Sequence, residues 1–393
     1  MKINFAIITL LLLTNFCFAQ NTAEDSLISG YKKPATYIGG YGNFFYQYNT
    51  KEKTSEINLE RVVLFLGHHF NDKFSFVSEF EIEDAKVSGG EKGGEVAIEQ
   101  AYIKFNLNRN SYFTAGLFLP RVGILNENHL PNTFNGNERT QVETYIIPST
   151  WRELGIGFYT HLDPFPVDLS FAILNGLNSA GFEHGNVIRE GRFEGRKASA
   201  NSLAITGAMQ YNKNNFKFQL SAYAGGSAGL SKKNADSLHL DAGPLGTPVF
   251  LAEADAQYTI DAFTLKALAT VISIPDAGKI NDAYSNNTPE GAYGLYAEAF
   301  YDFLYKLQAA RKRSLIGFIR YEIMDMNSKI PPNVIEDPLL SQNHLIIGLN
   351  YLPIPNLALK GDVRLRNTDK PKQANPTYNN NNSFVNLGVG FSF

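Results

Sequence analysis

Residues 216–223 read Phe-Lys-Phe-Gln-Leu-Ser-Ala-Tyr, with apolar side chains at 216, 218, 220 and 222 and polar ones between them. A period of two is that of a β-strand, whose successive side chains point to opposite faces of a sheet. The same period runs through residues 74–84 (FSFVSEFEIED) and 357–366 (LALKGDVRLR), where most of the polar positions are charged. These stretches therefore predict long strands with one apolar and one charged face.

Sixteen segments of this kind follow one another from residue 35 onward. Most have about ten residues or more, the length that a tilted strand needs to cross a bilayer. The expected strands are residues 35–49, 56–70, 74–84, 95–108, 112–121, 151–162, 167–176, 201–212, 216–227, 249–259, 262–273, 291–305, 313–326, 341–353, 357–367 and 383–393.

The joins between the expected strands are of two lengths. Very short joins follow strands 2, 4, 8, 10 and 14, whereas those after strands 5, 7, 9, 11, 13 and 15 run to about 10–30 residues. Phe and Tyr flank several short joins, as expected at a membrane interface. Short turns at one end and long loops at the other are typical of outer-membrane barrels. The prediction is an all-β fold, a transmembrane antiparallel up-and-down β-barrel of about 16 strands over residues 35–393.

The beginning of the chain has the pattern of an export signal. Lys2 precedes the apolar run 5–18, and the small residues Cys17 and Ala19 stand three and one positions before the cleavage expected at Gln20. That run is shorter than the roughly 20 apolar residues of a membrane-spanning helix. We therefore predict a signal peptide over 1–19, a short periplasmic segment over 20–34, and export to a Gram-negative outer membrane.

Composition and motifs argue against several classes of protein. The net charge of −3 excludes a strongly basic nucleic-acid binder. The seven His are scattered, Cys17 is the single Cys, and there is no phosphate loop or zinc helix motif. The sequence therefore predicts no enzyme, no cofactor and no metal site.

Two stretches resemble the phosphate-selective porin O/P family. The first is 58–67 (NLERVVLFLG), which contains Arg61, and the second is 99–105 (EQAYIKF) followed by 116–120 (GLFLP). The last strand, which ends on Phe393, is similar to the insertion signal of bacterial outer-membrane proteins. The chain departs from the family at Glu60, which replaces a second Arg, and at Leu119, which replaces a basic residue. The resemblance thus implies the barrel and the outer membrane more than selectivity for phosphate.

The longest loop, residues 122–150, is the expected pore constriction. The resemblance to general porins implies that such a loop folds into the barrel. The candidates for the constriction are Arg121, Glu138, Arg139 and Glu143. A loop that packs outside the barrel or contacts a partner is the alternative.

Charged side chains on the next long loop and on the strands complete the candidate site. Loop 177–200 carries four basic residues, which would form an anion funnel at the pore mouth or a solvated, salt-bridged loop: Arg189, Arg192, Arg196 and Lys197. The strand charges expected to face the lumen are Glu79, Glu81, Lys217, Arg320, Glu322, Lys360, Asp362, Arg364 and Arg366. Together with the other inward charges the two signs balance, so no ion preference is predicted.

The sequence favours an outer-membrane porin through which small hydrophilic solutes or ions diffuse passively. The alternative is a plugged barrel subunit that scaffolds a larger outer-membrane complex. The expected partners are outer-membrane lipid and small hydrophilic solutes, with a homotrimer or contacts to other envelope proteins left open.

Overall fold

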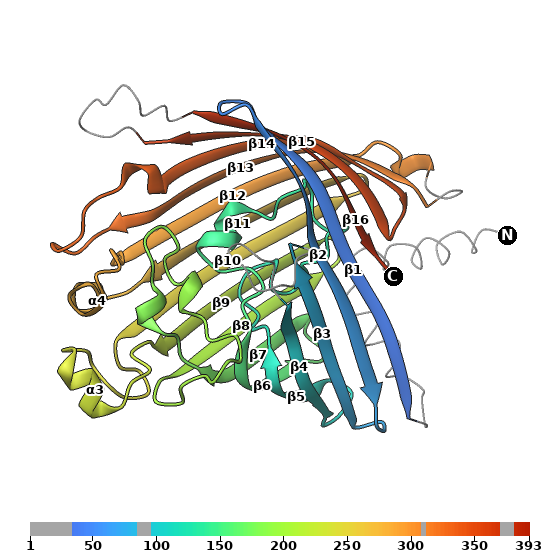
Figure 1. Ribbon diagram of the computed structural model, residues 1–393. Helices are drawn as coiled ribbons and strands as arrows, with labels where there is room; N and C mark the ends of the chain where they lie inside the picture. Colours follow the sequence, from blue (N-terminus) through green and yellow to red (C-terminus); the bar gives the residue numbers. More distant parts are fainter. Residues whose placement is uncertain (1–33, 85–95, 308–311, 370–380) are drawn as a thin grey trace.

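A computed structural model describes residues 34–84, 96–307, 312–369 and 381–393 of the chain. Within them, sixteen strands form one closed antiparallel barrel (Figure 1). The strands are β1 (Ala35–Asn49), β2 (Thr54–His69), β3 (Phe74–Glu83), β4 (Val96–Asn106), β5 (Ser111–Phe118), β6 (Glu153–His161), β7 (Val167–Asn175), β8 (Leu203–Lys213), β9 (Phe216–Gly226), β10 (Pro248–Ile260), β11 (Phe263–Ser273), β12 (Gly291–Asp302), β13 (Ser314–Lys329), β14 (Ser341–Ile354), β15 (Leu357–Thr368) and β16 (Asn382–Ser392).

The topology is the simplest that closes a sheet. Each strand pairs with its neighbours in sequence, and β1 pairs with β16 from Tyr41↔Ser392 to Asn49↔Phe384. The predicted fold class is confirmed, and the described strands match the sixteen expected segments to within a few residues. One difference is at β5, which ends at Phe118 because Pro120 has no N–H to donate to a ladder. The predicted signal peptide and residues 20–33 lie outside the described residues.

Helices are few and short, and none of those in the described part of the chain is long and apolar enough to cross a membrane. They lie in the joins between strands. The α-helices are α2 (Gln141–Tyr145), α3 (Lys232–Ser237) and α4 (Ala277–Tyr284), and the 3-10 helices are η2 (Ser179–Gly181), η3 (Arg189–Gly191), η4 (Tyr305–Leu307) and η5 (Pro338–Leu340).

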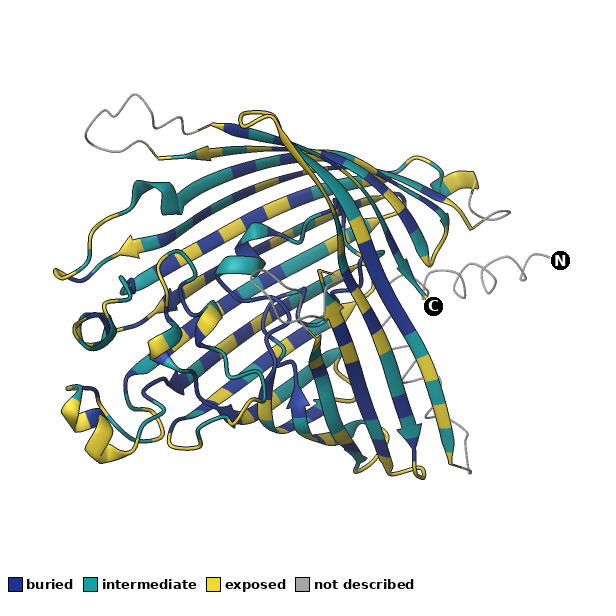
Figure 2. Cartoon of the chain, in the orientation of Figure 1, coloured by how far each residue is buried: buried dark blue, intermediate teal, exposed yellow. Residues whose placement is uncertain are grey.

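The two faces of the wall differ as the alternation predicts. Along β9, Gln219 and Ser221 are buried, whereas Leu220 between them is 43% exposed. Figure 2 shows the same alternation of buried and exposed residues along most of the wall. Exposed large apolar side chains on an outer barrel face are those that a bilayer covers.

The interior of the barrel is packed at the level of the long loops. Val142, Ile146 and Trp151 from the join between β5 and β6 are fully buried, as are Phe182 and Ile188 from the join between β7 and β8. They form one apolar cluster with side chains of the wall, including Leu174, Tyr223, Leu251, Ile272 and Met324. The chain between β5 and β6, with α2 in it, therefore lies within the barrel (Figure 1).

Candidate functional site

Loop 122–150 folds around the carboxylate of Glu143. That carboxylate accepts hydrogen bonds from Leu125 N at 2.7 Å, from Thr140 Oγ1 at 3.0 Å and from Tyr296 Oη on β12 at 2.9 Å. Glu143 is 1% exposed, and Thr140 caps the N-terminus of α2. The arrangement ties the two limbs of the loop to each other and to the wall, so Glu143 shapes the loop rather than facing water.

The middle of the loop is bound to β15. Lys360 Nζ donates to the carbonyl oxygens of Phe134 and Gly136, at 2.8 Å each. One carboxylate oxygen of Asp362 accepts from the backbone N of Asn137 at 2.8 Å and from its Nδ2 at 2.6 Å. The loop leaves the wall after β5 and returns to it at β6, so these bonds to β15 place its middle across the lumen.

Glu138 makes a two-pronged ion pair with the same strand. Its carboxylate accepts from Arg364 Nε at 2.7 Å and Nη2 at 3.0 Å, and from Asn386 Nδ2 of β16 at 3.0 Å. The Arg364 guanidinium lies 4.0 Å from the centre of the Phe384 ring, and that of Arg366 lies 5.7 Å from it. The structure thus brings together three of the predicted residues, one from the loop and two from β15.

A third set of contacts joins the loop to β12 and β13. Arg320 Nη1 donates to Asn135 O at 3.1 Å, and Asn135 Nδ2 donates to Glu298 Oε1 at 3.0 Å. Arg320 also pairs with Glu298 at 3.1 Å and with Glu322 at 2.8 Å. The backbone N of Val142 donates to Glu322 Oε2 at 3.1 Å, so these charges are matched across the loop and the wall.

The first part of loop 122–150, before its middle, contacts β9. Lys217 Nζ pairs with Glu127, whose side chain is mostly buried. Burial raises the pKa of the Glu127 carboxyl, but the charges of Lys217 and Arg121 outweigh burial and bring that pKa to about 2. The Arg121 guanidinium lies 5.1 Å from the centre of the Tyr159 ring. A cavity of about 100 Å³ borders this part of the loop and is lined by Phe65, Val77, Glu79, Gln100, Tyr102, Tyr112, Thr114, Phe118, Leu119, Arg121, Asn126, Glu127 and Tyr159.

The side chain of Arg139 points away from that of its neighbour Glu138 and lies beside the charges of β2 and β3. Its Nη1 donates to Thr150 Oγ1 at 3.4 Å, and its Nη2 is buried without a hydrogen-bond partner. The neighbouring Arg61 is bound to Glu60 at 3.0 Å and to Glu81 at 3.4 Å. The four constriction candidates therefore lie at different places along the loop and the wall instead of at one point.

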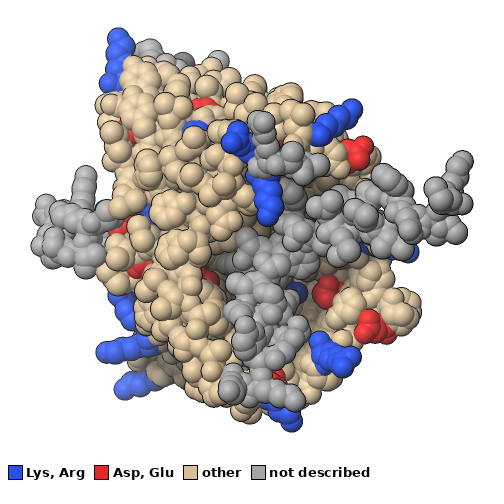
Figure 3. All heavy atoms as spheres, turned by 90° about the vertical axis from the view of Figure 1, so that its right-hand side faces the viewer, with Lys and Arg blue, Asp and Glu red and all other residues tan. Residues whose placement is uncertain are grey.

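Loop 177–200 packs on loop 122–150. Arg189 Nη1 donates to Thr144 O at 2.6 Å, and Arg192 Nη1 donates to Thr150 O at 3.4 Å while its Nη2 pairs with Glu194 at 2.9 Å. Two of the four predicted basic residues are therefore bound to protein. The other two are exposed: Arg196 and Lys197. Figure 3 shows the other end of the barrel, where Lys and Arg side chains stand at several places around the edge with Asp and Glu among them.

Several residues of this site carry no signal in the sequence. Asn135 and Asn137 bind the wall through amide groups and backbone atoms, and an uncharged residue in a long loop has no pattern to mark it. Arg61 and Glu298 pair with predicted charges on adjacent strands, and a search for inward charges next to each expected strand would have found them.

No family model matches the chain. An uncharacterized protein of Aquifex aeolicus (strain VF5) is 31% identical over 360 residues, which are 88% of this chain and 79% of that protein. Among solved structures, the anion-selective porin from Comamonas acidovorans has a TM-score of 0.55 at 12% identity, over 92% of this chain and 100% of that one. The outer-membrane channel DcaP of Acinetobacter baumannii has a TM-score of 0.54 at 13% identity, over 93% and 99%. Salmonella typhi OmpF, in complex with daunomycin, has one of 0.53 at 11% identity, over 91% and 97%. At these identities, the likeness establishes the porin fold alone.

Proposed function

The chain belongs to the same family as the Aquifex aeolicus protein, and from that premise and its fold we propose that it is an outer-membrane porin. Small hydrophilic solutes or ions would diffuse through its lumen without chemical change. Barrels of about 16 strands are wide enough for an aqueous channel, whereas barrels of eight are filled by their own side chains. This closed sixteen-stranded wall meets that requirement.

The observation that carries the proposal is the set of bonds between loop 122–150 and β15. Lys360, Asp362 and Arg364 bind the loop by hydrogen bonds and an ion pair. A loop held against a wall remote from its own ends narrows the lumen to the spaces beside it. We assign Arg121, Glu138 and Arg139 to the borders of those spaces, and Glu143 to holding the loop in shape.

The charges along this route support passage without strong ion preference. Lys217 is matched by Glu127, and Arg320 by Glu298 and Glu322. Opposite charges held in a narrow lumen create a local field across it, and their sum stays small. The exposed Arg196 and Lys197 would add a weak attraction for anions at the mouth.

A relationship to the phosphate-selective porin O/P family is part of the proposal, supported by the stretches around Arg61 and Tyr102. Selectivity for phosphate is not part of the proposal. Arg61 is the Arg of the resembling stretch, and its guanidinium is bound to Glu60 and Glu81. An arginine already paired with two carboxylates is a weak ligand for a further anion.

The apolar cluster inside the barrel favours a second candidate. Val142, Ile146 and Trp151 pack against Phe182 and Ile188 of loop 177–200, so the two loops form a common core with the wall. A lumen closed by such a core would suit a barrel subunit that scaffolds a larger outer-membrane complex. Such a subunit would co-purify stably with other envelope proteins and would not let solutes through.

The remaining parts of the proposal concern the location. A cleaved signal peptide over 1–19 and a periplasmic segment over 20–34 would deliver the chain to the outer membrane. The short turns would face the periplasm, lipid would cover the exposed apolar wall, and association as a homotrimer is compatible with this topology. No enzymatic activity, cofactor or nucleic-acid partner is proposed.

Swelling of proteoliposomes tests the proposal. Purified full-length chain reconstituted into liposomes should admit small sugars at rates that fall steeply as sugar size increases. Liposomes without protein are the control. Swelling equal to that of the control, with envelope proteins retained through purification, would favour the scaffold.

A further inference from the structure

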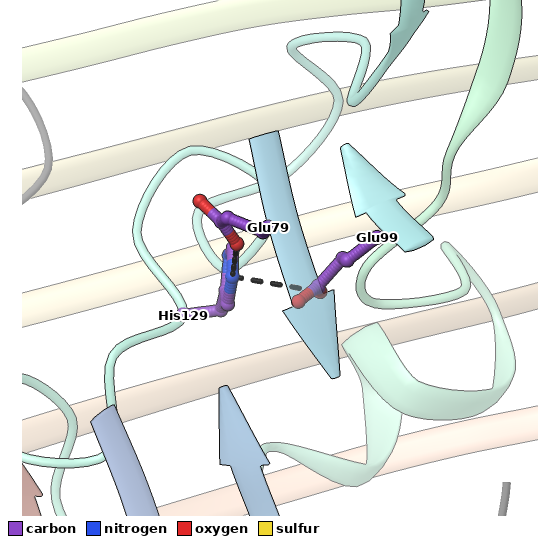
Figure 4. A group of neighbouring side chains, drawn as sticks. All are labelled: Glu79, Glu99 and His129. Carbon is purple, nitrogen blue, oxygen red and sulfur yellow. Dashed lines mark ion pairs between the residues drawn. The ribbon is translucent and has the colours of Figure 1, made fainter. Parts of the chain in front are cut away.

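Two carboxylates and one imidazole meet inside the barrel. Glu79 comes from β3, Glu99 from β4 and His129 from loop 122–150, and the three are 2%, 0% and 0% exposed (Figure 4). One ligand atom from each lies within 4.8 Å of the other two. In the part of the chain that the structure describes, no other group of three His, Cys, Asp or Glu side chains is arranged in this way.

The hydrogen bond of His129 Nε2 goes to Tyr41 Oη, at 2.9 Å, and not to the two carboxylates, whose spacing from that nitrogen suits ligands of a shared ion. His129 Nε2 lies 3.7 Å from Glu79 Oε2 and 3.5 Å from Glu99 Oε1. Both distances exceed the usual range of an N–H···O hydrogen bond. Two ligands bound to one tetrahedral ion at about 2.1 Å are about 3.4 Å apart. The cluster therefore already holds its nitrogen at nearly the distance from each carboxylate that a shared metal ion sets.

A fully buried oxygen without a hydrogen-bond partner points independently to a ligand. Glu99 Oε1 is inaccessible to solvent and has no hydrogen-bond partner. Its twin, Oε2, accepts from Tyr41 Oη at 2.9 Å. Leaving a buried carboxylate oxygen unsatisfied is costly, and a bound cation removes that cost.

Local backbone structure aims Glu99 at this point. Across β3 and β4, Glu79 pairs with Gln100 and Phe80 pairs with Ile98, so Glu99 is the extra residue of a β-bulge. A bulge re-aims a side chain that the regular alternation would send to the other face. Ile98 and Ile103 remain on the exposed face, while Glu99 points inward.

We infer that Glu79, Glu99 and His129 form a binding site for a divalent transition-metal ion of the Zn²⁺ type. One imidazole nitrogen with two carboxylate oxygens suits Zn²⁺, whereas Ca²⁺ and Mg²⁺ prefer oxygen ligands alone. The two carboxylates balance the charge of the ion. Tyr41 Oη is hydrogen-bonded to His129 Nε2 and donates to Glu99 Oε2, at 2.9 Å each. Because Nε2 has a single lone pair, the ion would replace the first of these bonds, and the phenol would keep orienting Glu99.

The ion would join loop 122–150 to a second part of the wall, at β3 and β4, four and five strands away from β15. Lys360 and Arg364 hold the middle of the loop on one side, and the metal would hold His129 against β3 and β4 on the other. Binding would therefore restrain the loop. The site itself follows from the cluster alone and stands whether or not the lumen conducts.

Zinc binding to the full chain tests the inference. Folded protein in detergent is freed of metal with a chelator, and bound Zn²⁺ is then measured by elemental analysis and by competition with a zinc indicator. The variants are Glu99→Gln, which keeps the shape of the side chain, and His129→Gln. The matched control is His344→Gln, because His344 is also fully buried but lies on β14, away from the cluster.

Wild type and the His344→Gln control should bind one equivalent of Zn²⁺, and a large excess of Ca²⁺ should not displace it. Glu99→Gln and His129→Gln should lower the affinity at least about tenfold, the smallest effect usual for losing even an outer partner of a metal. Circular dichroism of each variant verifies the barrel. If a variant fails to fold, hydrogen exchange in wild type decides, since Zn²⁺ should slow exchange around residue 129. Absence of stoichiometric Zn²⁺ in wild type, equal affinity in folded ligand variants, or unchanged exchange would overturn the inference.

Discussion

Replacement of Glu138 by Ala should release one of the contacts that hold the middle of loop 122–150 inside the barrel. The change removes both hydrogen bonds to Arg364, at 2.7 and 3.0 Å, and the bond from Asn386 at 3.0 Å. Lys360 and Asp362 still hold residues 134–137. We therefore expect a local opening next to Arg364 and not the loss of the whole loop.

The size of the effect follows from the contacts. A hydrogen bond to a charged group contributes about 1.5–3 kcal/mol, and less where water competes. The Glu138 side chain is 23% exposed and that of Arg364 is 8% exposed, so the pair as a whole is worth about 2 kcal/mol. Since 1.4 kcal/mol is tenfold in population, the opened state should become roughly 30-fold more frequent.

Single-channel recording in planar bilayers measures this population. The Glu138→Ala variant should visit a higher conductance level far more often than wild type. Glu183→Ala removes the same charge from an exposed position on loop 177–200 and is the matched control. Level occupancies in Glu138→Ala that equal those of wild type would refute the assignment of Glu138 to the narrowed part of the lumen.

Two further predictions concern the wall and its orientation. Leu220→Arg should block assembly, because Arg on the lipid face near the bilayer midplane costs about 2–4 kcal/mol, whereas Lys217→Gln on the inner face should assemble normally. The measurement is the amount of heat-resistant barrel in membrane extracts. Equal defects in the two variants would mean that the faces of β9 are misassigned. Trypsin added to intact cells should cut at the exposed Arg196 or Lys197. Cleavage confined to Lys213, the last residue of β8 before the short turn, would reverse the orientation.

The fold could be predicted because its signals are local. The period of two around Leu220 assigns the faces of one strand, and the unequal joins assign the ends of the barrel. Pairing of neighbours in sequence then leaves only one long-range contact to infer, between β1 and β16. Residues 122–150 stand out as the longest loop, and the resemblance to general porins implied that such a loop folds into the barrel.

The site was less predictable because its contacts join distant parts of the chain. The loop charges were visible, but nothing near Glu138 in sequence indicates Arg364 as its partner. Glu99 is hidden for another reason, since the bulge at that residue shifts the alternation of β4 by one position. Asn135 and Asn137 bind the wall through amide and backbone groups, which are common in loops and so mark no residue in the sequence. Burial of Glu143 likewise depends on Tyr296, which reaches it from β12.

Removal of residues 126–146 is the most direct test of the claim that this loop narrows a porin lumen. The deletion leaves all sixteen strands intact, and loops tolerate such changes better than strands. Single-channel conductance in planar bilayers should be small in wild type and should rise severalfold in the deletion variant. Unchanged conductance in a correctly folded deletion variant, or no conductance from either protein, would contradict the claim.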